Sequence, residues 1–123
     1  MQRADEILAS TDTSGEPREA LARLVAASWE IVHQQQNLLH AAERELPPER
    51  IRGTHDRVLR RMQSVITRGQ RDGVFRTDLP KHWLVTTAFS LMHSAADEVR
   101  AGRIKPDDVP VLLTQTLLAA FAP

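Results

Sequence analysis

The stretch Val65–Pro80, VITRGQRDGVFRTDLP, decides how this chain is expected to fold. Its first half continues a helix, and Gly73 is a natural stop because glycine takes the left-handed conformation of a helix C-terminus without strain. Phe75 follows as an apolar side chain that can pack against the joint. Asp78 and Pro80 are typical of a helix start, where Asp78 is expected to cap the free N–H groups. The stretch therefore predicts a tight joint between two helices.

The helical pattern extends outward from this joint over the whole chain. Apolar residues recur at helical spacing, the composition is rich in good helix formers, and hairpin signals are missing. We expect helices over residues 4–9, 18–45, 49–71, 79–100 and from a cap at Asp107 or Asp108 to Phe121. The polar run HQQQN at 33–37 weakens the second helix enough for a bend or break. The prediction is an all-α bundle of about five helices, with residues 1–17 as a short linking helix and loop and 18–123 as one domain.

The composition excludes several classes of function. Sixteen basic and 16 acidic residues give a net charge of zero, which argues against nucleic-acid binding through phosphate neutralisation by these residues. The absence of cysteine rules out disulfides, thiolate metal sites and cysteine nucleophiles. No apolar run approaches the roughly 20 residues that cross a bilayer, and the N-terminus lacks a signal-peptide core. We therefore expect a cytoplasmic protein that does not enter a membrane.

No motif commits the chain to catalysis. The five histidines show no metal-ligand spacing, and the glycines form no phosphate loop, so neither a metal nor a cofactor is expected. The serines have no nucleophile-elbow context. An arginine-rich run is expected to be a solvated helix face paired with nearby acids, because its members are spread around the helix and no aromatics interleave. These arginines are Arg52, Arg57, Arg60, Arg61, Arg68 and Arg71.

Two further features concern packing. Several large side chains fall on inward-facing positions, where an ordinary core is the default interpretation and a ligand pocket between helices is the alternative. They are Trp29, His33, Met62, Ile66, Phe89, Met92 and His93. The last two helices are apolar over a wider arc than one buried face requires, which predicts that a second face meets a partner.

The spacing of Gly69, Gly73, Phe75, Arg76 and Asp78, placed before two strongly apolar helices, resembles the C-terminal regulatory domain of TetR-family transcriptional repressors. The resemblance covers about residues 18–122. The family's N-terminal helix-turn-helix module is absent from this chain, and ADEILAS resembles the end of the helix that links the two parts. DNA binding is therefore expected only through an N-terminal domain outside these 123 residues.

The resemblance implies a ligand-binding and dimerisation domain whose last two helices pair with those of a second copy in a four-helix bundle. It makes Trp29, His33, Met62, Phe89 and His93 the candidates for a pocket that takes a small apolar or aromatic effector. The candidate interface residues are Leu84, Leu91, Ala95, Val99, Leu113, Leu117 and Phe121. The main alternative is a stand-alone helical module that binds another protein, and a helical-bundle enzyme ranks below both.

Overall fold

The computed structural model describes the backbone of residues 2–42 and 48–123 and the side chains of residues 3–35 and 53–123. The helices are α1 (Gln2–Ala9), α2 (Pro17–Ala42), α3 (Pro48–Arg71), α4 (Lys81–Arg100) and α5 (Val109–Phe121), with a 3₁₀ turn η1 (Pro106–Asp108) before α5. No strand occurs in the described part of the chain. The prediction of an all-α bundle of about five helices is confirmed.

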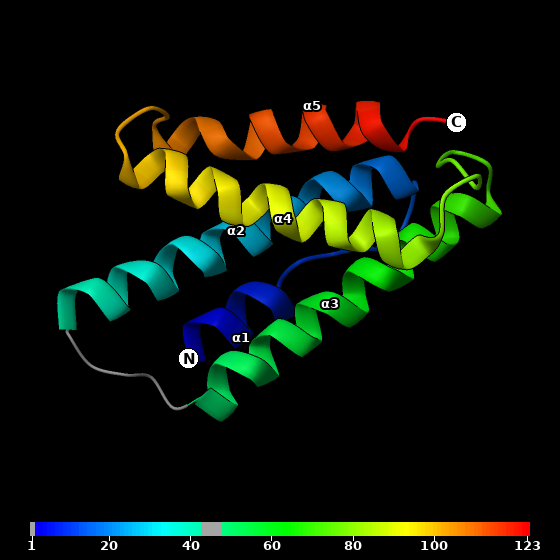
Figure 1. Cartoon of the computed structure of the whole chain (residues 1–123). Helices are drawn as coiled ribbons and strands as arrows, with labels where there is room; N and C mark the ends of the chain where they lie inside the picture. The colour runs from blue at the N-terminus through cyan, green and yellow to red at the C-terminus, as the bar shows by residue number, and fades with distance from the viewer. Residues whose placement is uncertain (1, 43–47) are drawn as a thin grey trace.

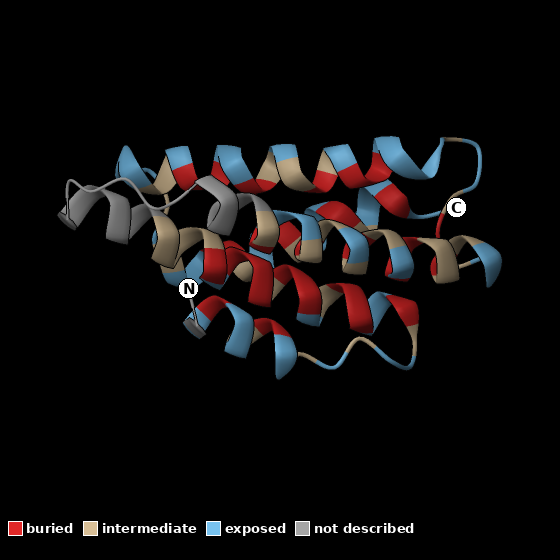
Figure 2. Cartoon of the chain, turned by 90° about the horizontal axis from the view of Figure 1, so that it is seen from below, coloured by how far each residue is buried: buried red, intermediate tan, exposed pale blue. Residues whose placement is uncertain are grey.

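Helix α2 is the centre of the bundle, because it packs against each of the other four helices (Figure 1). Its inward face is small and apolar near the start, and Ala20, Leu21, Leu24 and Val25 are fully buried. Ser28 is buried on the same face and donates its hydroxyl to the Leu24 carbonyl at 2.7 Å, so it adds no unpaired polar group to the core. Buried residues line the facing sides of the helices, and exposed residues cover the outer sides (Figure 2).

The start of α2 shows why the chain turns after the first helix. Pro17 begins the helix, as predicted from its fixed φ, and the Glu16 carboxylate accepts hydrogen bonds from the backbone N–H groups of Arg18 and Glu19 at 2.5 and 3.1 Å. The Arg18 side chain also bonds this carboxylate and lowers the pKa of Glu16.

Helix α2 continues through residues 33–37 without the expected break. The predicted end at residue 45 lies outside the described residues.

The first part of the joint after α3, from Gly69 to Phe75, forms as the sequence predicts. Gly73 has a φ of 76°, and the N–H groups of Val74 and Phe75 both donate to the Gly69 carbonyl, at 2.9 and 3.0 Å. Phe75 folds back over Gly69 so closely that a β-carbon there would lie 2.0 Å from the ring. The ring of Phe75 is buried edge-on against Phe121 at the end of α5, with centroids 5.8 Å apart.

The predicted capping role of Asp78 is wrong. Helix α4 begins at Lys81, and Pro80 occupies the N-cap without a side-chain hydrogen bond, so Asp78 lies before the first turn. Its carboxylate instead accepts two hydrogen bonds from the Arg76 guanidinium, from Nε to Oδ1 at 2.7 Å and from Nη2 to Oδ2 at 2.8 Å. Asp108 does precede α5, but it too makes no side-chain capping bond because η1 already bonds the backbone there.

Arg76 in turn covers the end of α5. Its backbone N–H donates to the Phe121 carbonyl at 2.7 Å, and its Nη1 donates to the Ala120 carbonyl at 3.3 Å. The last carbonyls of a helix have no partner within the helix, so these bonds satisfy groups that would otherwise face solvent. The joint therefore fixes the C-terminus of α5 as well as the path from α3 to α4.

Candidate functional site

The first hollow is an open groove between α3 and α4 with a volume of about 530 Å³. Its lining combines apolar walls with two imidazole rings and two hydroxyls, contributed by His55, Leu59, Val85, Thr86, Phe89, Ser90 and His93. Two of these, Phe89 and His93, belong to the pocket predicted from the sequence. His55, which no motif singled out, joins them because α3 and α4 pack side by side.

The polar groups of this hollow have a definite orientation. The ring of Phe89 meets His55 edge-on, with centroids 5.0 Å apart. The Nδ1 of His93 lies 2.7 Å from the Phe89 carbonyl, which can only accept, so Nδ1 carries the proton. In the neutral ring, Nε2 of His93 is then an acceptor. The lining of the hollow therefore combines the apolar ring of Phe89 with an acceptor nitrogen on the neutral form of His93.

The other predicted pocket residues lie elsewhere. Met62, Ile66 and Met92 are fully buried in the core, which matches the default interpretation of these positions. Trp29 is also buried, and its ring stacks on that of His33 one turn later, with centroids 5.4 Å apart and planes 20° apart. The seven residues are therefore divided between the core, the Trp29–His33 stack and the α3–α4 hollow.

The second feature is the outer surface of α4 and α5. A groove of about 180 Å³ runs between these helices, and three residues predicted for a dimer interface, Leu91, Ala95 and Leu113, line it. Val99 is half-buried. Leu84, Leu117 and Phe121 are buried inside the chain's own core, and Ala95 and Leu113 are buried there too, although they line the groove. Their side chains are thus used within one copy.

Helix α5 presents a different set of residues outward. Val111 and Leu112 are 59% and 47% exposed, and the exposed positions that follow are occupied by Gln115, Thr116, Ala119 and Ala120. None of the 13 residues of the helix is charged. A helix that faces water on one side normally carries charges there, so this surface is unusual for a solvated face. We call these six exposed residues the outer face of α5.

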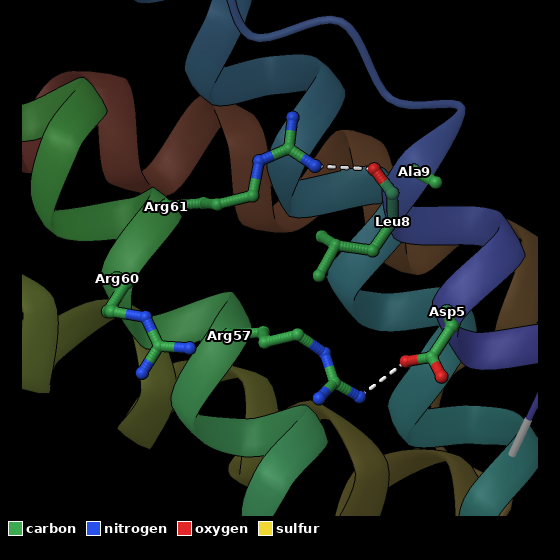
Figure 3. A pocket seen from close by; sticks show the side chains of 6 residues that line it. All are labelled: Asp5, Leu8, Ala9, Arg57, Arg60 and Arg61. Carbon is green, nitrogen blue, oxygen red and sulfur yellow. Dashed lines mark hydrogen bonds and ion pairs between the residues drawn. The ribbon is translucent and has the colours of Figure 1, made fainter.

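The third feature is a groove between α1 and α3, enclosing about 510 Å³ (Figure 3). It is lined by Asp5, Leu8, Ala9, Arg57, Arg60 and Arg61. The three arginines occupy positions i, i+3 and i+4 of α3 and therefore share one side of the helix. We call this feature the arginine groove.

The arginines of this groove differ in their partners. Arg57 forms an ion pair with Asp5, and Arg61 donates to the carbonyls of Leu8 and Thr11 and to the Thr13 hydroxyl. Arg60 makes no hydrogen bond or ion pair within residues 3–35 and 53–123 (Figure 3). Among the arginines of the run whose side chains the structure describes, the expected pairing with an acid thus holds for Arg57 only, and the side chain of Arg52 lies outside the described residues. The spacing of 57, 60 and 61 is the signal that could have predicted their grouping.

The described residues contain no group of three metal-ligating side chains, and none of the described helices is long and apolar enough to cross a membrane. Comparison with protein-family models, with curated proteins and with solved structures gave no match. The function must therefore be argued from the geometry of the three features described above.

Proposed function

We propose that this chain is the small-molecule-sensing and dimerisation domain of a TetR-like transcriptional regulator. In this proposal two copies associate through α4 and α5, and an effector bound in each copy shifts the spacing of DNA-binding heads carried on the N-terminal side. The observation that carries the proposal is the outer face of α5, which is exposed, free of charge and apolar at four of its six positions.

The physical argument favours a second copy as the partner. In a twofold dimer, residues near the axis meet their own copies, so a charge there would face a like charge. A helix without charged residues avoids that repulsion. It also avoids the cost of removing charges from water, and the cores of protein interfaces are depleted of charged residues. The groove between α4 and α5 adds a concave apolar surface beside the exposed Leu112.

Support for sensing comes from the α3–α4 hollow. Ligand sites in helical domains are apolar spaces between helices with a few polar groups that orient the guest. The hollow has that character, with Phe89 as an apolar wall and the imidazoles of His55 and His93 beside it. Because α4 contributes to both the hollow and the outer surface, a ligand that moves α4 would alter the dimer geometry, which is a population shift between two arrangements.

A reporter assay tests the dimer and its regulatory use together. The chain is fused to a DNA-binding head that represses its reporter only as a dimer. We expect repression with the native sequence and its loss in Leu112→Asp, which places a charge opposite its own copy. Ser64→Asp adds the same charge at an exposed position of α3 and should leave repression intact. Equal repression in both variants would count against the proposed interface.

A neutral aromatic probe tests the sensing part. Indole is expected to raise the melting temperature in a saturable manner, because its ring can pack on Phe89 and its N–H can donate to Nε2 of His93. Phe89→Ala should abolish the shift, whereas Trp83→Ala, which changes an exposed aromatic outside the hollow, should preserve it. An indole response that survives Phe89→Ala would locate the binding elsewhere.

One observation favours a second candidate, a stand-alone module that binds another protein. Trp83 on α4 is 53% exposed, and tryptophan is enriched among the residues that dominate heterotypic interfaces. This candidate predicts a chain that stays monomeric by itself and binds its partner less well after Trp83→Ala. The dimer proposal predicts that self-association is insensitive to this substitution.

A further inference from the structure

The arginine groove carries more positive charge than the acidic side chains that line it can neutralise. Three guanidinium groups line the groove, and Asp5 is the one carboxylate among its described lining residues, which leaves a local excess of two positive charges. The chain as a whole is neutral, so this excess is a local property. Such a concentration attracts anions by its own field.

The partners of each arginine show how much of this charge is available. The hydrogen-bond partners of Arg61 are uncharged oxygens that fix the guanidinium in position, and the nearby Asp12 carboxylate offsets part of its charge. Arg57 is paired with Asp5, but both side chains are substantially exposed, and exposed ion pairs of this kind contribute little stability. Arg60 is exposed and unpaired within residues 3–35 and 53–123. An incoming anion therefore finds one free arginine and one whose partner is easily exchanged.

The groove also has an apolar part. The side chain of Leu8 is buried at its base and points toward α3 (Figure 3), and Ala9 of α1 also lines the groove. An anion with an apolar body can cover these groups while its charged end stays near the guanidinium groups. A guanidinium fork matches the two oxygens of a carboxylate, with two parallel N–H···O bonds.

We propose that the arginine groove binds a small organic acid, with its carboxylate held by Arg60 and Arg57 and its apolar body resting on Leu8 and Ala9. Binding displaces Asp5 from Arg57, while Arg61 keeps α1 and α3 together through its bonds to the backbone. The groove lies on α1 and α3, and α5 contributes nothing to it. The inference is therefore independent of the dimer and should hold in the Leu112→Asp variant as well.

Titration calorimetry of the whole chain with octanoate tests this inference, with inorganic phosphate and 1-octanol as comparison ligands. We expect one saturable site for octanoate and markedly weaker binding of both others, since phosphate lacks the apolar body and octanol lacks the charge. Arg60→Ala should weaken octanoate binding roughly tenfold, the effect of losing a charge-assisted hydrogen bond. Arg71→Ala removes the same charge from an exposed position outside the groove and should leave binding unchanged.

A second variant gives an effect of opposite sign. Asp5→Asn removes the carboxylate that competes for Arg57, so octanoate should bind several-fold more tightly. Circular dichroism of each variant verifies that the helices remain. The absence of saturable octanoate binding, or binding unaffected by Arg60→Ala, would overturn the proposal. Phosphate binding as tight as that of octanoate would overturn the assignment of an organic acid.

Discussion

Two arginine arrangements, one along α3 and one in the joint that follows it, differ in how completely the chain satisfies their hydrogen-bond donors. Arg76, in the joint after α3, gives both arms to Asp78 and reaches the last carbonyls of α5. In the arginine groove, Arg57 has an exposed partner and Arg60 has none among the described residues. An arginine whose N–H donors all have acceptors within the chain stabilises the fold. An arginine with unpaired donors can instead bind a ligand.

The comparison changes how the joint is interpreted. Gly69 provides room for Phe75, Phe75 packs on Phe121, and Arg76 is held by Asp78 over the end of α5. Each conspicuous residue of the pattern therefore has a structural task. The joint explains why α5 is fixed in place, and the proposed binding surfaces are the arginine groove, the α3–α4 hollow and the outer face of α5.

The largest expected effect comes from removing the centre of the joint. Phe75→Ala deletes a fully buried aromatic side chain and should lower the free energy of unfolding by about 3–5 kcal/mol. Trp83→Ala is the control, because Trp83 is a large but exposed aromatic and should cost far less in the monomer. Urea denaturation measures both. Equal losses in the two variants would contradict the packing described for Phe75.

A matched pair of glycine substitutions in α3 sharpens the same point. Gly69→Ala forces a β-carbon into the Phe75 ring and should cost about 2 kcal/mol, despite the better helix propensity of alanine. Gly53→Ala meets only the end of the Arg57 side chain at 3.5 Å and should stabilise by about 0.5–1 kcal/mol. Thermal unfolding should therefore shift in opposite directions, and a stabilising Gly69→Ala would refute the close packing.

The Arg76–Asp78 pair predicts a dependence on pH. The hydrogen bond from Arg76 lowers the pKa of Asp78 in the folded chain. Ionised Asp78 therefore stabilises the fold above a pH of about 4, and this contribution is lost as the pH falls through the lower pKa of the folded state. Native protein should be more stable than Asp78→Asn at neutral pH, and urea midpoints should converge in acid. A gap that stays constant with pH would contradict this assignment.

The smallest effect on stability is expected in the arginine groove. Arg60→Ala removes an exposed side chain without a partner in the described residues, so the free energy of unfolding should change by less than about 0.5 kcal/mol. Arg76→Ala removes a guanidinium that donates to three acceptor atoms, two of the Asp78 carboxylate and the Ala120 carbonyl oxygen, and should destabilise the chain measurably. Chemical denaturation of the two variants compares them directly. A large loss for Arg60→Ala would show that its charge is used within the fold.

Much of the fold could be predicted because its signals are local. Gly73, Pro17 and the helical spacing of apolar residues each act within a few positions, and the helices follow from them. The prediction of Asp78 as a helix cap is wrong because the carboxylate of Asp78 accepts hydrogen bonds from Arg76 and α4 begins only at Lys81. The sequence pattern contains no sign of which of these two interactions is stronger.

The sites could be predicted less well because they depend on long-range packing. Asp5 and Arg57 are 52 positions apart, and only the docking of α1 on α3 creates the arginine groove. The apolar residues of α5 cover a wider arc than one buried face requires, which predicts two covered faces. The pattern does not tell which of the two packs on the chain's own core. The structure assigns Leu117 and Phe121 to the inside and Val111 and Leu112 to the surface.

Sedimentation velocity of the native chain and of Leu112→Asp at tens of micromolar is the most direct test of the central claim, that the outer face of α5 joins two copies. Trp83→Ala serves as the control for an exposed apolar residue outside this face. We predict a species of twice the chain mass for the native protein and for Trp83→Ala, and a folded monomer for Leu112→Asp. A native chain that sediments as a monomer, or a Leu112→Asp variant that remains dimeric, would contradict the account.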